Sequence, residues 1–159
     1  MGALYCMKIA FCGHSDYVPC ANDECLAMEF LFQNIPCDEE CEFFLGEYGS
    51  FDSFAYGIAK KYKKNKPTAK LIFVTPYISN EYLKRHDVDN RFDLVIYPEL
   101  EKSPPRFAIA KRNKWIAKNT DILICFVNRK LGGAYTMLNY AKKYSKIIFN
   151  LAEQNDIDV

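Results

Sequence analysis

The sequence lacks the features that mark membrane proteins and strongly basic nucleic-acid-binding proteins. No uninterrupted apolar run approaches the roughly 20 residues that a membrane helix needs. The N-terminus has neither a basic lead nor a long apolar stretch, so we expect no signal peptide and a cytoplasmic location. The 21 basic and 20 acidic residues leave a net charge of +1, which gives no reason to expect a general electrostatic attraction to nucleic acid.

The chain also lacks the cysteine spacing of a zinc site, although it contains seven cysteines. No C-x-x-C pair occurs. The short spacings are Cys20-x4-Cys25 and Cys37-x3-Cys41, with His14 as a further candidate ligand. These spacings fall outside the usual zinc pattern. Without an export signal the cysteines should be reduced thiols, and we predict no metal and no cofactor.

Two nucleotide-binding fingerprints are missing as well. The sequence has no G-x-x-x-x-G-K-[ST] and no complete G-x-G-x-x-G, so neither a P-loop ATPase nor an ordinary NAD-binding domain is supported. No nucleophile–base pair can be identified from the sequence.

Apolar runs of strand length alternate with stretches of helical period, a pattern typical of βα units around a parallel sheet. We therefore predict an α/β fold, a Rossmann-like three-layer sandwich with a mainly parallel central sheet. A single domain should cover residues 1–151, and a polar tail should follow over 152–159. The expected strands are 7–12, 41–45, 71–74, 94–97, 122–127 and 146–151. The expected helices are about 23–33, 51–64, 105–119 and 132–144, and residues 76–92 are expected to be irregular.

Glycines follow three of the predicted strands, where open parallel sheets bind their ligands. They are Gly13, Gly46 with Gly49, and Gly132 with Gly133. Gly132-Gly133 joins a buried strand to a helix, whose free N–H groups favour an anion, and Thr136 could add a hydroxyl. The alternative is a glycine-rich loop with a threonine cap. We expect a phosphate site here, with Gly13, Gly46 and Gly132 at one edge of the sheet.

Polar side chains on the helix from residue 105 form a second candidate. Arg106 and Asn113 fall on the same predicted helical face as Ile109, Ile116 and Ala117, which should face the sheet. A buried charge is costly unless paired, so Arg106 needs a phosphate or a carboxylate. An internal ion pair to Asp93 or Glu99 is the structural alternative, and Asn113 could be a structural hydrogen-bonding residue.

Four further residues near the predicted strand ends are candidates. Glu47 and Asp52 are the nearest carboxylates and would be the catalytic groups of an enzyme, although Asp52 could simply complement a helix dipole. His14 and Ser15 follow the first strand, where His14 could be a base, a phosphate contact or an ordinary loop residue.

Four segments of the chain carry a resemblance to a known family: FCGHSDY, FLGEYGSFD, IYPELEKSPPRFAIAKRNKWIAKNTDILICFV and GGAYTMLNYAKK. They resemble segments of small bacterial and phage proteins in the SLOG superfamily, which includes Lonely-Guy enzymes, DprA-like proteins and nucleotide-sensing domains. The resemblance implies a nucleotide-binding Rossmann-like domain and a homodimer. The Lonely-Guy motif P-G-G-x-G-T-x-x-E is incomplete here, with Leu131, Tyr135 and Asn139 in place of its Pro, later Gly and catalytic Glu. Ser15 stands where many relatives have Arg.

We therefore expect a sensor or binding module for a nucleotide-like phosphate ligand. The alternative is a hydrolase or transferase acting on a nucleotide N-glycosidic bond. A third hypothesis is a DprA-like partner of single-stranded DNA, but the near-neutral charge makes nucleic acid the less expected partner.

Overall fold

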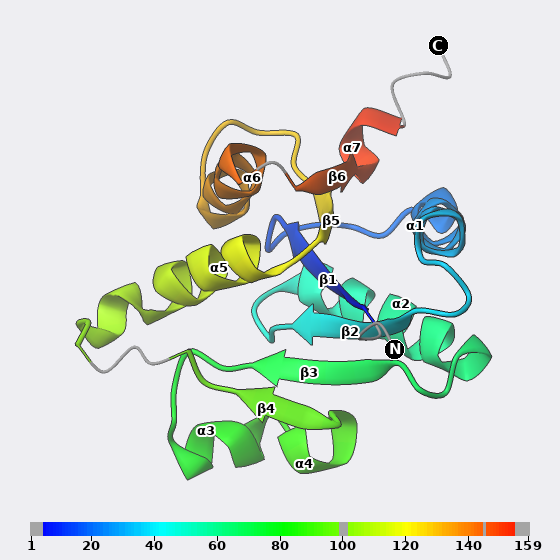
Figure 1. The fold of residues 1–159 in the computed structure, drawn as a ribbon. Helices are drawn as coiled ribbons and strands as arrows, with labels where there is room; N and C mark the ends of the chain where they lie inside the picture. The colour runs from blue at the N-terminus through cyan, green and yellow to red at the C-terminus, as the bar shows by residue number, and fades with distance from the viewer. Residues whose placement is uncertain (1–4, 99–101, 145, 155–159) are drawn as a thin grey trace.

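The computed structural model describes residues 5–98, 102–144 and 146–154, and they form a six-stranded parallel sheet between layers of helices (Figure 1). The strands are β1 (Cys6–Gly13), β2 (Glu40–Leu45), β3 (Lys70–Val74), β4 (Leu94–Ile96), β5 (Ile122–Phe126) and β6 (Ile147–Asn150). The longer helices are α1 (Ala21–Asn34), α2 (Ser50–Asn65), α5 (Ala108–Asn119) and α6 (Gly133–Lys143). The predicted Rossmann-like α/β fold is confirmed.

The strand order β4-β3-β2-β1-β5-β6 places a topological switch in the middle of the sheet. The chain moves outward from β1 to β4, then returns through α5 to β5, which pairs with the other side of β1. Cys12 of β1 lies opposite Cys125 of β5 in this parallel register. Ligands of such sheets bind at the switch point, outside the carboxyl ends of the strands.

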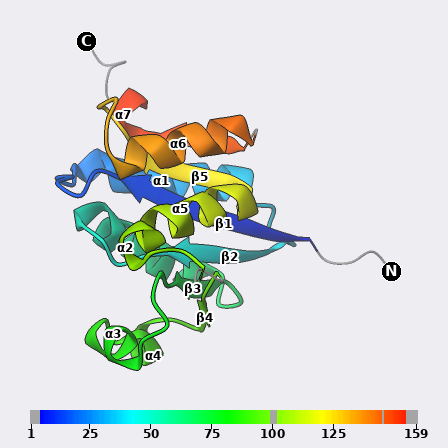
Figure 2. The ribbon, with the colours of Figure 1, turned by 90° about the vertical axis from the view of Figure 1, so that its left-hand side faces the viewer.

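The two faces of the sheet carry separate apolar cores. One core contains residues of α1 and α2, such as Leu31 and Ile58, packed against Phe43 and Phe73 of the sheet. The other core contains residues of α5 and α6, such as Ile116 and Leu138. Figure 2 shows α5 and α6 in front of β1 and β5, with α1 behind them. Because both faces are covered, the inner strands can be continuously apolar, as β5 is.

Three details of the predicted secondary structure are corrected. The segment expected to be irregular contains two short helices, α3 (Asn80–Arg85) and α4 (Val88–Arg91). The helix expected from residue 105 begins with a 3₁₀ turn, η1 (Pro105–Phe107), before α5. The start of the expected tail is helical, in α7 (Leu151–Gln154), while 155–159 lie outside the described residues.

All seven cysteines are free thiols, and no cluster of metal-ligating side chains occurs within the described residues. None of the helices in the described part of the chain has the length and apolar character needed to cross a membrane.

Candidate functional site

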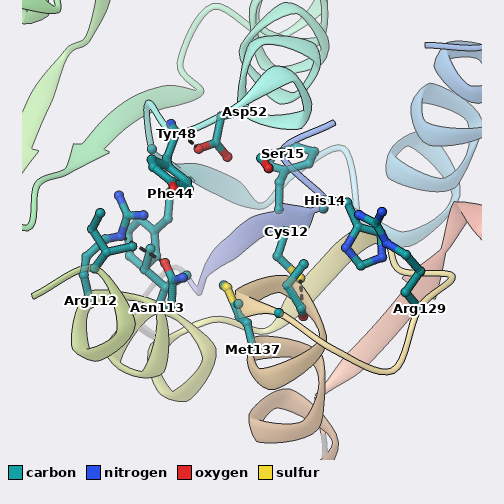
Figure 3. Close-up of a pocket in the computed structure, with 18 of the residues that line it drawn as sticks. Cys12, His14, Ser15, Phe44, Tyr48, Asp52, Arg112, Asn113, Arg129 and Met137 are labelled. Atoms are coloured by element: carbon teal, nitrogen blue, oxygen red, sulfur yellow. Dashed lines mark hydrogen bonds between the residues drawn. The ribbon is translucent and has the colours of Figure 1, made fainter. Parts of the chain in front are cut away.

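A cavity of about 290 Å³ lies at the carboxyl edge of the sheet, at the topological switch (Figure 3). Its walls come from the loops after β1, β2 and β5 and from residues of α2, α5 and α6. The predicted site residues among them are Gly13, His14, Ser15, Gly46, Asp52, Asn113, Gly132 and Gly133. The expectation that Gly13, Gly46 and Gly132 share one edge is therefore confirmed.

A buried arginine that the sequence did not single out forms one wall of the cavity. Arg112 is only 4% exposed, and its Nη1 donates to the carbonyl oxygen of Val74 at 3.2 Å. Its Nε donates to the Asn113 side chain at 3.1 Å. No carboxylate of the described residues forms an ion pair with it. Because an arginine stays charged in proteins, this guanidinium is a ready partner for an anion entering the cavity.

Asp52, in the first turn of α2, lies near this guanidinium without pairing directly with it. Both side chains approach the same point beside Gly46, where a Cβ would lie 2.7 Å from Arg112 Nη1 and 3.3 Å from Asp52 Oδ2. Gly46 is thus required by the close approach of Arg112. Burial raises the pKa of Asp52 to about 6, against the opposing effects of Arg112 and of the Tyr48 backbone N–H, which donates to Asp52 at 2.7 Å.

His14 joins the ends of β1 and β5. Its Nε2 accepts a hydrogen bond from the backbone N–H of Asn128 at 3.2 Å, and the residue is buried. Burial and the nearby charge of Arg129 lower the pKa of His14, which keeps the ring neutral at pH 7. His14 is thus held as a structural acceptor at the cavity wall.

Arg129, which follows Asn128 in the sequence, lies at the cavity mouth and forms a bidentate ion pair with Asp16. The distances from Arg129 to the two Asp16 oxygens are 2.7 and 3.0 Å, and both side chains are exposed. The pair connects the loop after β1 to the loop after β5. An anion that approached Arg129 would compete with the Asp16 carboxylate.

The first turn of α6 closes another side of the cavity. Gly132 has a φ of 90°, a backbone conformation that favours glycine, and nothing lies within 4 Å of a Cβ placed on Gly132 or Gly133. Gly132, Gly133 and Ala134 all line the cavity. Thr136 lies outside the cavity lining, and its hydroxyl donates to the carbonyl oxygen of Gly132 at 3.1 Å.

Three other predicted site residues do not line the cavity. Arg106 falls in the 3₁₀ turn before α5, so it is exposed and stacks on Phe107 at 4.8 Å, which corrects its placement on the buried helical face. Glu47 pairs with Arg91 at 2.5 Å. Gly49 packs against the backbone of Ser15.

The structure also bears on the alternative for Arg106, an internal ion pair to Asp93 or Glu99. Asp93 binds Lys63 at 2.7 Å and the backbone of Leu71, so it is engaged elsewhere. Glu99 lies outside the described residues. Asn139, at the position of the catalytic Glu of Lonely-Guy enzymes, is exposed on α6 and does not line the cavity.

The charges of the chain are strongly segregated along the sequence, and two of the basic residues, Arg112 and Arg129, line the cavity. Residues 102–150, which contain α5 and α6, carry eleven basic residues and a single acidic one, Asp121. We call this part of the molecule the basic layer. Asp121 binds Lys8 N and the Tyr5 hydroxyl, near the start of β1 and far from the cavity. The basic residues are Lys102, Arg106, Lys111, Arg112, Lys114, Lys118, Arg129, Lys130, Lys142, Lys143 and Lys146.

The rest of the described chain has the opposite balance. Residues 5–98 carry fourteen acidic and ten basic residues. Helix α1 contains Asp23, Glu24 and Glu29 and no basic residue. Among the described residues, the ion pair of Arg129 with Asp16 is the only one that neutralises a member of the basic layer. The near-zero net charge is therefore the sum of two regions of opposite sign.

Comparison with known proteins shows similarity at the level of the fold. No family model and no curated protein matches the sequence. Two solved structures of DNA processing protein A (DprA) are similar. The one from Streptococcus pneumoniae has a TM-score of 0.59 and 18% identity over 91% of this chain. The one from Helicobacter pylori, a protein that binds single-stranded DNA, has a TM-score of 0.57 and 16% identity over 91% of this chain.

These similarities agree with the resemblance seen in the sequence motifs, since DprA proteins have the Rossmann-like domain of the SLOG superfamily. The chain spans 50% of the Streptococcus protein and 64% of the Helicobacter protein. The homodimer expected from the resemblance stays a prediction.

Two predictions about function are corrected by this comparison. The expected small nucleotide-like ligand, shared by the sensor and the N-glycosidase hypotheses, is wrong, because the similar structures are of DNA processing proteins and one of them binds single-stranded DNA. The expectation that nucleic acid is an unlikely partner is wrong for the same reason. The physical error lay in the use of net charge, which averages over surfaces that the fold keeps apart.

The sequence-based site prediction missed Arg112, Arg129 and Tyr48, which all line the cavity. Arg112 precedes Ile116 by four residues and follows Ala108 by four, so the correct helical phase would have placed it on the buried face. The absence of acidic residues from both α5 and α6 was the signal for the basic layer.

Proposed function

We propose that this protein binds single-stranded nucleic acid at the carboxyl edge of its sheet, with the phosphates held by the basic layer. The observation that carries the proposal is the segregation of charge, with eleven basic residues and one acidic residue over 102–150. Phosphate neutralisation by lysine and arginine supplies most of the affinity of proteins for nucleic acids. The similarity in fold to a DprA that binds single-stranded DNA supports the same partner.

One phosphate of the strand would bind at the start of α6. Gly133 and its neighbours line the cavity at the N-terminus of α6, where the positive end of the helix dipole favours an anion. Arg129 lies at the mouth and Arg112 forms a wall of the same cavity. Thr136 would contribute only if its hydroxyl released the carbonyl oxygen of Gly132.

The orientation of the helices adds to the attraction. Helices α2, α5 and α6 all begin at the carboxyl edge, and residues of each first turn or its vicinity line the cavity: Asp52, Ile109 and Gly133. The partial positive charges of these N-termini therefore point toward the same place. The cavity combines this field with the buried charge of Arg112.

A fluorescence anisotropy titration tests the proposal. A labelled single-stranded oligonucleotide of mixed sequence should bind the purified protein at low salt, and unlabelled single strand should displace it. Deoxynucleoside monophosphates at millimolar concentration should not displace it, because each offers only one phosphate. Absence of binding at low salt, or equal displacement by mononucleotides, would overturn the proposal.

A further inference from the structure

Large apolar side chains are exposed in the loops at the carboxyl side of the sheet, and two of them, Tyr48 and Leu131, line the cavity. Each of the connections that follow β1, β2, β3, β4 and β5 presents one such residue at the carboxyl side of the sheet. Scattered apolar residues are ordinary on a protein surface, but a gathering at one edge indicates an interaction site. The residues are Val18, Tyr48, Ile78, Phe107 and Leu131.

Tyr48 is the aromatic residue at the cavity mouth. The residue is 64% exposed, whereas its backbone N–H is fixed by the 2.7 Å hydrogen bond to Asp52. Figure 3 shows Tyr48 beside Asp52, across the cavity from Met137. The side chain is thus held at the site by its backbone while its ring is left free for contact.

Phe107 is the second exposed aromatic residue of these loops, and it lies directly before α5. It is 44% exposed, and the Arg106 guanidinium stacks over its ring at 4.8 Å. Leu131 likewise follows two exposed basic residues, Arg129 and Lys130. Apolar side chains and basic residues therefore alternate in two loops at the carboxyl side of the sheet, with Arg106 beside Phe107 and Lys130 beside Leu131.

This alternation matches the chemistry of an unpaired nucleic-acid strand. Each nucleotide offers a flat apolar base and a negative phosphate, and proteins that bind single strands combine basic grooves with aromatic side chains on which bases stack. A purely apolar protein partner would not call for the adjoining cations. The bases of a duplex are stacked on one another and cannot use such rings.

We propose that Tyr48 and Phe107 stack on unpaired bases of the bound strand. This inference rests on the proposed function. It assigns base contacts to the exposed apolar loop residues, separately from the phosphate contacts of the basic layer.

The test compares two probes of equal length, an ordinary single-stranded oligonucleotide and an abasic one that keeps the sugar–phosphate chain. Tyr48→Ala and Phe107→Ala should each weaken binding of the ordinary strand by about tenfold. Neither should change binding of the abasic strand. Tyr48→Phe should bind both probes as the parent does. Phe32→Ala is the matched control, because Phe32 is 53% exposed on α1 and lies away from the cavity.

A fluorescent base analogue within the strand provides a second readout. Its emission should fall on binding to the parent and fall less with Tyr48→Ala, because stacking quenches it. Equal losses for both probes, or no loss for either, would overturn the inference while leaving the proposed function intact. If the parent bound neither probe, the proposed function itself would fail. Unchanged unfolding temperatures would verify that the alanine variants are folded.

Discussion

Helices α1 and α5 have equivalent structural roles and opposite surfaces. Each packs an apolar side against one face of the sheet, α1 through Leu31 and α5 through Ile116. The outward side of α1 carries only acidic charges, and α5 carries Lys111, Lys114 and Lys118 with no acidic residue. Packing therefore fixes one side of each helix and leaves the other side free to be adapted to a partner.

The more acidic part of the chain, residues 5–98, and the basic layer meet at the cavity. Asp52 comes from α2, and Arg112 comes from α5 of the basic layer. The carboxyl edge at the topological switch is thus also the boundary between negative and positive surface. A polyanion would approach from the basic side and encounter Asp52 and Asp16 as the nearest carboxylates.

The largest effect should come from reversing charge on the basic layer. Lys111→Glu combined with Lys130→Glu should weaken binding of single-stranded DNA by about a hundredfold at physiological salt, since two cations become anions. Both lysines are exposed. Lys111 lies in the first turn of α5, and Lys130 precedes α6. Anisotropy titrations would measure the change.

The matched control makes the same substitutions in the other layer. Lys60→Glu combined with Lys64→Glu alters two exposed lysines of α2 and changes the net charge equally. Affinity should change by less than about threefold at physiological salt, where charges beyond a Debye length are screened. Equal losses for the two double variants would show that only net charge matters and would remove the distinction between the layers.

The carboxyl group of Asp52, at the boundary between the two regions, should make the free energy of unfolding depend on pH. The pKa of Asp52 is raised to about 6 from 3.8, so the folded state binds its proton more tightly than the unfolded state. The resulting stabilisation is fully present below about pH 4 and is lost as pH rises through about 6. We expect a loss of about 2 kcal/mol, reduced from the full value of the shift by partial solvent screening.

Asp52→Asn should remove this pH dependence, because an amide does not titrate while its oxygen can still accept from the Tyr48 N–H. Unfolding in denaturant at pH 4.5, 6 and 7.5 would compare the parent with the variant. If the stabilities of the parent and the variant changed by the same amount between pH 4.5 and 7.5, the result would contradict the raised pKa of Asp52.

A smaller effect on binding is expected at Arg112. Arg112→Met keeps the length of the side chain and removes the charge, so single-strand affinity should fall by about tenfold through loss of a charge-assisted contact. Because Arg112 lowers the pKa of Asp52, that pKa should rise further in the variant, as followed by carboxyl NMR. Unchanged affinity in a folded variant would make Arg112 a structural residue.

The smallest effect should have the opposite sign. Asp16→Asn frees Arg129 from its ion pair, so the affinity for a single strand should rise by about two- to fivefold, as expected for an exposed pair. Asp89→Asn, at an exposed position of α4, removes the same charge elsewhere and should change affinity less. A decrease in affinity with Asp16→Asn would show that Asp16 positions Arg129 productively.

The sequence predicted those elements whose apolar pattern is unambiguous. The apolar run of β5 and the stripe of α2 were both located correctly, and Phe51, Ala55, Ile58 and Tyr62 of that stripe are buried. Helices α3 and α4 were not predicted, because their segment has no apolar stripe. Val88 is the only buried residue of these two helices.

The site was predicted only in part, for a geometric reason. The glycines could be placed at one edge because parallel strands all end there. Arg106 and Arg112 could not be distinguished, because the 3₁₀ turn at the start of α5 shifts which residues face the sheet. The ion pair of Arg129 with Asp16 joins residues 113 positions apart, a contact that no local pattern reveals.

The salt dependence of single-strand binding tests the role of the basic layer most directly. Dissociation constants of the parent and of Lys111→Glu/Lys130→Glu would be measured over a range of sodium chloride concentrations. If at least three phosphates are neutralised, the logarithm of the association constant of the parent should fall with the logarithm of salt with a slope of about −2 or steeper. The double variant should lose about one unit or more of that slope. A slope near zero for the parent, or the same slope for both proteins, would contradict the assignment of phosphate binding to the basic layer.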